Sequence, residues 1–314
     1  MLKNIIKAKD GSINYLLENI NKNIIECRYV RRNPSYISTY LSSHTGCKMG
    51  CTFCWLTQSK QTQFDHVTIQ EYSSQLNIVL KNTPKNIDLN NIRINVNFMS
   101  RGEAMANKYV INNYQNLYDS LYNVVTNNGY NKMKMNVSSI YPNTLKGHKL
   151  ETIFQDRPVN FYYSIYSCND SFRKQYLPNA APVRYALDQL KNLQENHNNI
   201  NTVVFHCAFI KGANDNISEV NDMADLIKSY DFKRTKFNLV RLNPYIKNGI
   251  PIMEESSKET LKEIFHIMNN AVTNKVPTQV SRIVNRVGSD AFVSCGMFAN
   301  TDVDMDIFDK AIDE

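Results

Sequence analysis

Residues 36–54 read YISTYLSSHTGCKMGCTFC, a short apolar run followed at once by three closely spaced cysteines. The run Tyr36–Ser42 is rich in β-branched and aromatic residues, as a β-strand is. Cys47, Cys51 and Cys54 therefore lie in the loop after a predicted strand, in a C-x3-C-x2-C spacing that can bring three thiolates together. A structural zinc or a fully ligated iron–sulfur cluster takes four protein ligands, so three cysteines leave one iron of a 4Fe-4S cluster open.

Spacing alone also allows two other states of these thiols. One is a zinc site with His44 as the fourth ligand, because His44 lies three residues before Cys47. The other is three thiols without any metal.

Outward from this loop, short apolar runs alternate with longer segments of helical periodicity. The expected strands are Tyr36–Ser42, Arg93–Ser100, Lys132–Ser138, Val159–Tyr166, Thr202–Ile210 and Lys236–Leu242. The expected helices are Ile69–Lys81, Tyr109–Asn127, Asn143–Phe154, Val183–Asn196, Val220–Lys228 and Ser256–Asn274. Six strands that alternate with helices predict an α/β fold, a partial (βα)6 barrel or an open parallel sheet.

Polar residues follow most of these strands. Arg101-Gly102-Glu103, Ser138-Ser139, Tyr166–Asp170 and Asn243-Pro244-Tyr245 all stand at the carboxyl end of a predicted strand, as the cysteine loop does. In parallel α/β folds chemistry occurs at that edge, so these loops are expected to form one site.

Composition sets further bounds. With 314 residues, 42% of them hydrophobic, the chain can bury a large core, which excludes a disordered chain or a small disulfide scaffold. Seven cysteines and no recognisable signal peptide predict a reducing, cytoplasmic location. No apolar run is long enough to span a membrane. The net charge of +7 allows an anionic partner such as a nucleic acid without requiring one.

The two ends are expected to be appendages of the barrel. Residues 1–32 are predicted to form a small N-terminal extension or cap, and residues 33–285 the barrel. Residues 286–314 form a C-terminal segment that carries Cys295 and an acidic tail, Asn300–Glu314, which is expected to be a short surface helix.

The cysteine spacing, with Phe53 before the last cysteine, resembles the signature of radical S-adenosylmethionine enzymes. Beyond it, the chain resembles one branch of them, the RlmN/Cfr family of RNA adenine methyltransferases, from about Glu26 to Asn300. The matching segments are LSSHTGC (41–47), FMSRGEA (98–104), VSS (137–139), SIYSCND (164–170), LPN (177–179), KGAND (211–215), LNPY (242–245) and SCG (294–296). Their common order and spacing carry the resemblance.

This resemblance implies a radical-SAM partial barrel with two cofactors, a 4Fe-4S cluster and S-adenosylmethionine. In such enzymes the open iron binds the methionine end of S-adenosylmethionine, and an electron donor such as flavodoxin or ferredoxin supplies the electron that cleaves it. The resemblance assigns Gly102 and Glu103 to the amino group of the cofactor, where a carboxylate would face an ammonium. It assigns the ribose and carboxylate to residues at other strand ends, namely Ser138, Ser164, Tyr166 and Asn243.

The resemblance also implies catalytic roles. Cys295 would carry a methyl group taken from one S-adenosylmethionine by its thiolate, and an RNA (rRNA or tRNA) would receive it. Glu26 corresponds to the acidic residue that the family uses as a proton acceptor.

The chain departs from the family in ways that bear on the reaction. The family has a resolving cysteine seven residues before the first cluster cysteine, and here that residue is Tyr40. Cys27, Cys168 and Cys207 are the candidates to replace it, and Cys168 is favoured because loops at strand ends reach the reacting centre. The chain also begins near the family's catalytic core, without the N-terminal accessory domain.

Two other classes of function remain open from the sequence. One is a radical enzyme that acts on a small molecule, nucleotide or peptide without a carrier step. The other is a zinc-stabilised nucleic-acid-binding module without catalysis.

Overall fold

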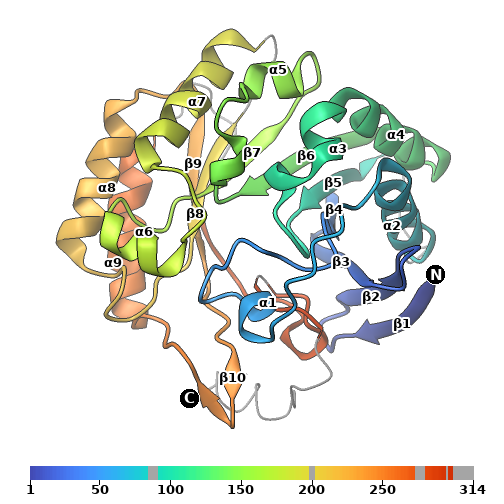
Figure 1. Cartoon of the computed structure of the whole chain (residues 1–314), viewed down its shortest axis with the longest axis horizontal. Helices are drawn as coiled ribbons and strands as arrows, with labels where there is room; N and C mark the ends of the chain where they lie inside the picture. The colour runs from blue at the N-terminus through green and yellow to red at the C-terminus, as the bar shows by residue number, and fades with distance from the viewer. Residues whose placement is uncertain (84–90, 198–201, 273–279, 295, 300–314) are drawn as a thin grey trace.

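The computed structural model describes residues 1–83, 91–197, 202–272, 280–294 and 296–299. Within them one curved sheet has ten strands in the order β1-β2-β3-β4-β5-β6-β7-β8-β9-β12, and helices cover its outer face (Figure 1). The strands are β1 (Leu2–Lys7), β2 (Ile13–Glu18), β3 (Ile24–Asn33), β4 (Tyr36–Leu41), β5 (Arg93–Phe98), β6 (Lys132–Ser139), β7 (Asn160–Ser164), β8 (Val203–Cys207), β9 (Thr235–Val240) and β12 (Arg282–Val284).

Strands β4 to β9 pair in parallel, each with the next along the chain. These are the six strands expected from the sequence, and the ends of each observed strand lie within three residues of the predicted ends. The α/β fold with a partial parallel barrel is therefore confirmed. A seventh parallel strand, β12, pairs with β9 and was not predicted, because three residues are too few to show a pattern.

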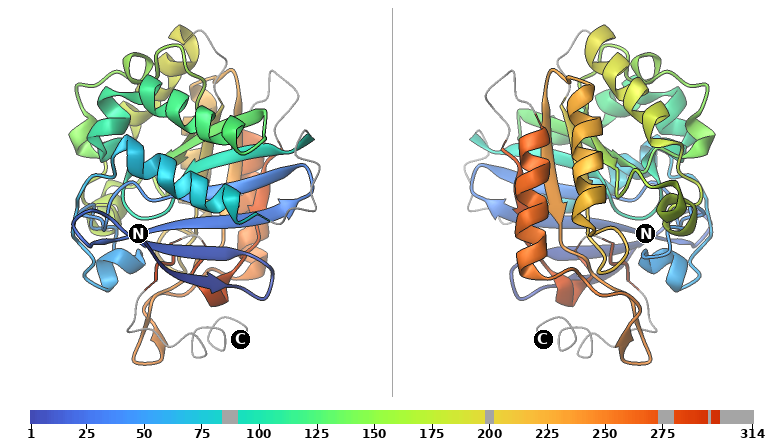
Figure 2. Two further views of the ribbon diagram at one scale, coloured as in Figure 1. Left: turned by 90° about the vertical axis from the view of Figure 1, so that its right-hand side faces the viewer. Right: turned by 90° about the vertical axis from the view of Figure 1, so that its left-hand side faces the viewer.

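The N-terminal segment, predicted as an extension or cap, consists of three strands. Strands β1, β2 and β3 pair antiparallel with one another, and β3 pairs antiparallel with β4, so they extend the same sheet (Figure 2). The physical reason is that β3 is buried along most of its length, which is possible only for a strand paired on both edges. The domain boundaries themselves stay a prediction.

The helices match the expected segments, with two of those segments broken. The described helices of the barrel wall are α2 (Ile69–Lys81), α3 (Lys108–Asn112), α4 (Tyr114–Asn127), α5 (Leu150–Phe154), α7 (Val183–Asn196), α8 (Ile217–Ser229) and α9 (Lys258–Ala271). Asn113 ends α3 and begins α4, which divides the predicted helix 109–127. Gly147, with φ +90, interrupts the predicted helix 143–154, so that only Asn143–Leu145 (3-10) and α5 form.

Short elements surround the carboxyl ends of the parallel strands. They are α1 (Trp55–Gln58), α6 (Asp170–Tyr176), the 3-10 turns η2 (Ala104–Ala106) and η4 (Ser289–Ala291), and the hairpin of β10 (Ile246–Lys247) with β11 (Ile250–Pro251). No described helix is long and apolar enough to cross a membrane. The predicted helix at Asn300–Glu314 lies outside the described residues.

Candidate active site

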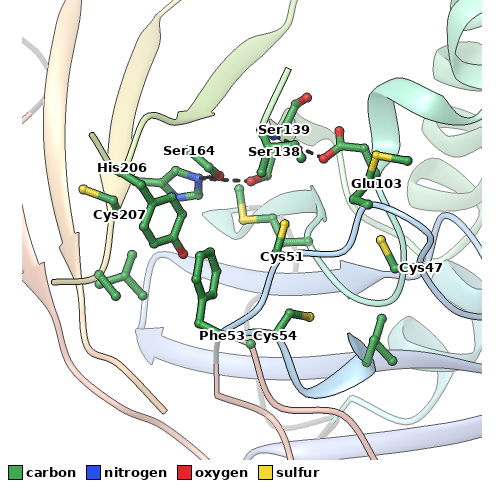
Figure 3. Close-up of a pocket in the computed structure, with 18 of the residues that line it drawn as sticks. Cys47, Cys51, Phe53, Cys54, Glu103, Ser138, Ser139, Ser164, His206 and Cys207 are labelled. Carbon is green, nitrogen blue, oxygen red and sulfur yellow. Dashed lines mark hydrogen bonds between the residues drawn. The ribbon is translucent and has the colours of Figure 1, made fainter. Parts of the chain in front are cut away.

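A cavity of about 190 Å³ lies at the carboxyl ends of the parallel strands, where the sequence predicts the site. Every described residue predicted to hold the cluster or the cofactor lines it: Cys47, Cys51, Cys54, Gly102, Glu103, Ser138, Ser164, Tyr166 and Asn243. Figure 3 shows the three cysteines on one loop, across the cavity from His206 on β8. Residues at or just after the carboxyl ends of strands β4 to β9 therefore meet in one pocket.

The cysteine loop is held by backbone hydrogen bonds at both ends. The Cys47 N–H donates to the Gln61 carbonyl at 3.0 Å, and the Thr52 N–H donates to the Tyr176 carbonyl at 3.1 Å. All three thiols are free of disulfides. Burial raises the pKa of each thiol, and the neighbouring thiols add to this for Cys47 and Cys51. Without a metal these groups are thiols rather than thiolates, so a metal must displace their protons on binding.

The arrangement disfavours a single zinc ion. The His44 ring stacks on Phe64 at 3.8 Å, and its Nε2 lies 3.1 Å from His66 Nδ1. His44 does not line the cavity, and burial lowers its pKa to about 3. Among the described residues, no three His, Cys, Asp or Glu side chains converge closely enough to share one metal ion. Cysteines around a four-iron cluster stand further apart, because each binds a different iron.

Glu103 presents a buried carboxylate with neutral partners. Its Oε1 accepts from the Met105 N–H at 3.1 Å and its Oε2 from the Ile140 N–H at 3.2 Å. Burial raises the pKa of Glu103 to about 7, and the Ser139 hydroxyl and the two N–H groups only partly oppose it. In the part of the chain that the structure describes, no cationic side chain pairs with this carboxylate. The site thus has room for a positive charge carried by a ligand.

Gly102 is required by close packing beside Glu103. Its φ is +93, and a Cβ there would lie 2.6 Å from Nδ1 of His44. No other residue fits, because neither the buried imidazole nor its backbone can retreat.

His206 is the main site residue that the sequence did not reveal. Its Nε2 lies 2.7 Å from Ser164 Oγ and 3.1 Å from Ser138 Oγ, as Figure 3 shows. Burial lowers the pKa of His206 to about 4, so the ring is neutral and joins the two serines in one hydrogen-bond network. The sequence signal for His206 is weak: it is a single histidine in the apolar run VVFHC, with buried residues on both sides.

Two aromatic side chains form one wall of the cavity. Phe53 stacks on Tyr166 with ring centroids 4.5 Å apart and planes at 28°. Tyr166 has φ +53, a conformation that is costly for an aromatic residue and typical of functional loops. The Asn214 side chain donates to the Tyr166 carbonyl at 3.0 Å and so supports this turn.

Asn243 is fixed at the end of β9 by two neighbours. The Trp55 indole N–H donates to its carbonyl at 2.9 Å, and Arg286 Nε donates to its Oδ1 at 3.2 Å. Arg286 and Arg241 both pair with Glu255, which fixes the guanidinium groups beside the cavity.

Glu26 lies in a buried ion cluster rather than in the cavity lining. Its carboxylate pairs with Arg101 at 2.6 Å and with Arg28 at 3.1 Å, and its Oε1 accepts from the Ala299 N–H at 3.0 Å. Burial alone would raise the pKa of Glu26, but the two arginines outweigh it and hold this pKa below its usual value. Glu26 is thus fully buried, and its role as a proton acceptor stays a prediction.

The remaining cysteines are divided by the structure. Cys168 packs against the main core and does not line the cavity, and burial raises its pKa to about 11. Cys207 lines the cavity, but Figure 3 shows its sulfur directed away from the three cluster cysteines. Tyr40 packs near Val293 in a separate apolar cluster. Cys295 lies outside the described residues, although Gly296 and Phe298 beside it line the cavity.

Comparison with known proteins agrees with this geometry. No protein-family model matches the chain. A probable dual-specificity RNA methyltransferase RlmN of Alkaliphilus oremlandii is 26% identical over 302 residues, 94% of this chain and 78% of that protein. The ribosomal RNA large subunit methyltransferase Cfr of Staphylococcus warneri is 25% identical over 306 residues, again 94% of this chain and 78% of that protein.

Among solved structures, a radical SAM methyltransferase from Sphaerobacter thermophilus superposes with a TM-score of 0.74 at 18% identity. The match covers 95% of this chain and 80% of that one, which establishes a common fold. The chain is thus a divergent relative of the RlmN/Cfr methyltransferases and has the fold of the radical S-adenosylmethionine enzymes.

Proposed function

We propose that the chain is a radical S-adenosylmethionine methyltransferase that modifies an adenine of RNA with Cys295 as the methyl carrier. One observation carries the proposal: three free thiols, a buried carboxylate without a cation and a set of hydroxyl groups line the same cavity at the strand ends. The relatives' printed names supply the reaction class and the RNA substrate.

Cys47, Cys51 and Cys54 would hold a 4Fe-4S cluster. Their spacing along the loop, their lack of disulfides and the absence of a fourth cysteine in the same loop fit a cluster with one open iron. When bound, the cluster and S-adenosylmethionine supply a 5′-deoxyadenosyl radical, with the electron from a donor such as flavodoxin or ferredoxin.

Glu103 would bind the ammonium group of S-adenosylmethionine. A cation beside this buried carboxylate favours its ionised form, whose pKa burial otherwise raises to about 7. Ser138, Ser164 and Asn243 would donate to or accept from the ribose and carboxylate oxygens, and neutral His206 orients the two serine hydroxyls. The aromatic wall of Phe53 and Tyr166 offers a face on which an adenine ring can stack.

The carrier role of Cys295 is supported by its neighbours. Gly296 and Phe298 line the cavity, and Arg28 donates to the Val293 and Met297 carbonyls at 3.1 and 2.6 Å. The segment on both sides of Cys295 is therefore held against β3. Cys168 stays the prediction from sequence for the thiol that releases the product. It does not line the cavity, so its position does not support this role.

The test is product analysis with anaerobically prepared protein, S-adenosylmethionine, a reductant and adenine-containing RNA. The wild-type chain is expected to bind about four irons, to cleave S-adenosylmethionine and to add a methyl group to adenine. Cys295→Ala should keep the iron and the cleavage and lose the methyl transfer. Methylated RNA from Cys295→Ala would exclude the carrier role, and a zinc-loaded wild-type protein with full activity would exclude the radical mechanism.

A further inference from the structure

The inner face of the barrel, below the cofactor cavity, is polar. A second cavity of about 200 Å³ opens there, lined by residues along the length of the parallel strands. Its lining follows the alternation of the strands: Tyr36, Ser38 and Tyr40 on β4, Arg93, Asn95 and Asn97 on β5, Lys134 and Asn136 on β6, Lys236 and Asn238 on β9, and Arg282 on β12. Barrel interiors are ordinarily filled by branched apolar side chains, so a polar interior calls for a ligand.

The lining has a pronounced excess of positive charge. Five cationic side chains reach the cavity, and no carboxylate is among the residues that line it. Arg93 and Arg282 are exposed at the mouth, whereas Lys236 is only 8% exposed. Burial, followed by repulsion from Lys134 and the two arginines at the mouth, lowers the pKa of Lys236 to about 7. Burial also lowers the pKa of Lys134, to about 8.

Buried polar atoms that face the cavity lack partners among the described residues. The Lys236 ammonium has neither an ion pair nor a hydrogen bond there and lies 5.9 Å from the centre of the Tyr162 ring. The Oδ1 atoms of Asn136 and Asn238 are buried acceptors that receive no hydrogen bond. A buried charge without a partner destabilises the folded protein. Such a group is retained where a bound ligand supplies the missing partner.

We propose that this cavity is a binding site for a terminal phosphate group, that of a phosphomonoester or a diphosphate. A phosphomonoester carries a charge of about −1.5 to −2 at pH 7, and its oxygens suit the forked donors of Arg93 and Arg282. A phosphodiester within an RNA strand carries one charge only and continues on both sides, which fits an interior cavity with five cations less well. The unpartnered asparagine oxygens can accept hydrogen bonds from hydroxyl groups of the same ligand.

The site adjoins the cofactor cavity. Met99, His206 and Val240 line both cavities, so a ligand held by its phosphate would extend towards His206 and the two serines bound to it. The proposal does not depend on the proposed function, because it concerns binding to residues that hold neither the cluster nor Glu103.

Calorimetry on the full-length, anaerobically prepared protein tests the proposal with pyrophosphate, 5′-AMP and adenosine as probes. Pyrophosphate and 5′-AMP are expected to bind at micromolar concentrations and adenosine at least tenfold more weakly. Lys236→Met and Arg282→Gln should each weaken pyrophosphate binding at least tenfold. Lys262→Met, an exposed lysine on α9, is the matched control and should bind as the wild type does.

Two outcomes would overturn the site. Absence of pyrophosphate binding, or equal binding by the wild type and Lys236→Met, would show that the cavity is not a phosphate-binding site. A 5′-hydroxyl RNA oligonucleotide that binds as tightly as its 5′-phosphorylated form, and whose binding Lys236→Met abolishes, would mean that the site takes internal phosphodiesters instead. Methyl transfer is not measured in any arm, so failure here leaves the proposed function untouched.

Discussion

Glu103 is the residue whose charge state depends most on what occupies the cofactor cavity. Glu103→Gln keeps the size but removes the negative charge that would face an ammonium. It also replaces one of the two acceptor oxygens by an NH2 group, so one of the bonds from the Met105 and Ile140 N–H groups is lost. Loss of a charge-assisted bond of about 1.5–3 kcal/mol lowers the affinity for S-adenosylmethionine roughly 10- to 150-fold. Anaerobic calorimetry measures this affinity, with the exposed Glu263→Gln as the control. An unchanged affinity in Glu103→Gln would place the amino group elsewhere.

Lys236 offers a test at the same scale that needs no cofactor. Its folded-state pKa, about 7, lies below the unfolded value of about 10.4, so the unfolded state binds more protons between these values. The penalty of the buried ammonium is therefore complete below pH 7 and fades as the pH rises towards 10.4. Lys236→Met should stabilise the protein by on the order of 2–4 kcal/mol at pH 6.

Denaturant unfolding of Lys236→Met and the wild type across this pH range gives the comparison. The difference should shrink towards pH 10, and pyrophosphate should stabilise only the wild type. A constant difference at every pH would show that packing, not charge, separates the two proteins. Lys262→Met is again the control, because an exposed lysine has no such penalty.

At the scale of elements, strand β3 is tied to the rest of the site through Glu26. Glu26→Gln would leave the buried guanidinium groups of Arg28 and Arg101 without a counter-charge, which costs about 3–5 kcal/mol. The folded pKa of Glu26 is lowered, so its contribution is complete above the unfolded pKa of about 4.3 and is lost as the pH falls through the folded value.

Unfolding of Glu26→Gln should therefore converge with that of the wild type in acid. The control is Glu18→Gln, which removes a partly exposed pair with Lys3 and should cost under about 1 kcal/mol. If the free energy of unfolding falls by the same small amount in both variants, the buried cluster contributes little and β3 is held by its strand pairing alone.

The elements that could be predicted from the sequence are those with a local signal. Thr68 and Glu71 form a capping box at the start of α2, and its predicted range is the observed one. The three cysteines and the polar residues at the strand ends converge because parallel strands direct their carboxyl ends to one edge. Strands β1 to β3 were not predicted, although each pairs through a short turn with the next strand along the chain. The role of Arg101 could not be predicted, because its partners on β3, in the cysteine loop and at Ala299 are far from it in the sequence.

At the scale of the whole molecule, segments near the two ends of the described chain are joined by hydrogen bonds. The Gly288 N–H donates to Asp10 at 2.8 Å, and the Lys9 N–H donates to Asp290 at 2.9 Å. Together with the bonds from Arg28, these contacts fasten the described part of the C-terminal segment to β3 and to the turn between β1 and β2. The N-terminal strands thus serve the site by positioning the segment that flanks Cys295.

This coupling predicts a local effect of removing both carboxylates. In Asp10→Ala/Asp290→Ala, the N–H groups of Lys9, Ser12 and Gly288 lose acceptors worth about 1 kcal/mol each. Two of these bonds hold the C-terminal segment, so it should open more often while the barrel stays folded. Hydrogen exchange of amides within 287–294 should rise several-fold, with α2 and α7 unchanged. Asp119→Ala, which removes an exposed pair with Arg157, is the control and should leave those amides as they are. Equal protection of 287–294 in the double variant and the wild type would mean that the Arg28 bonds alone hold the segment in place.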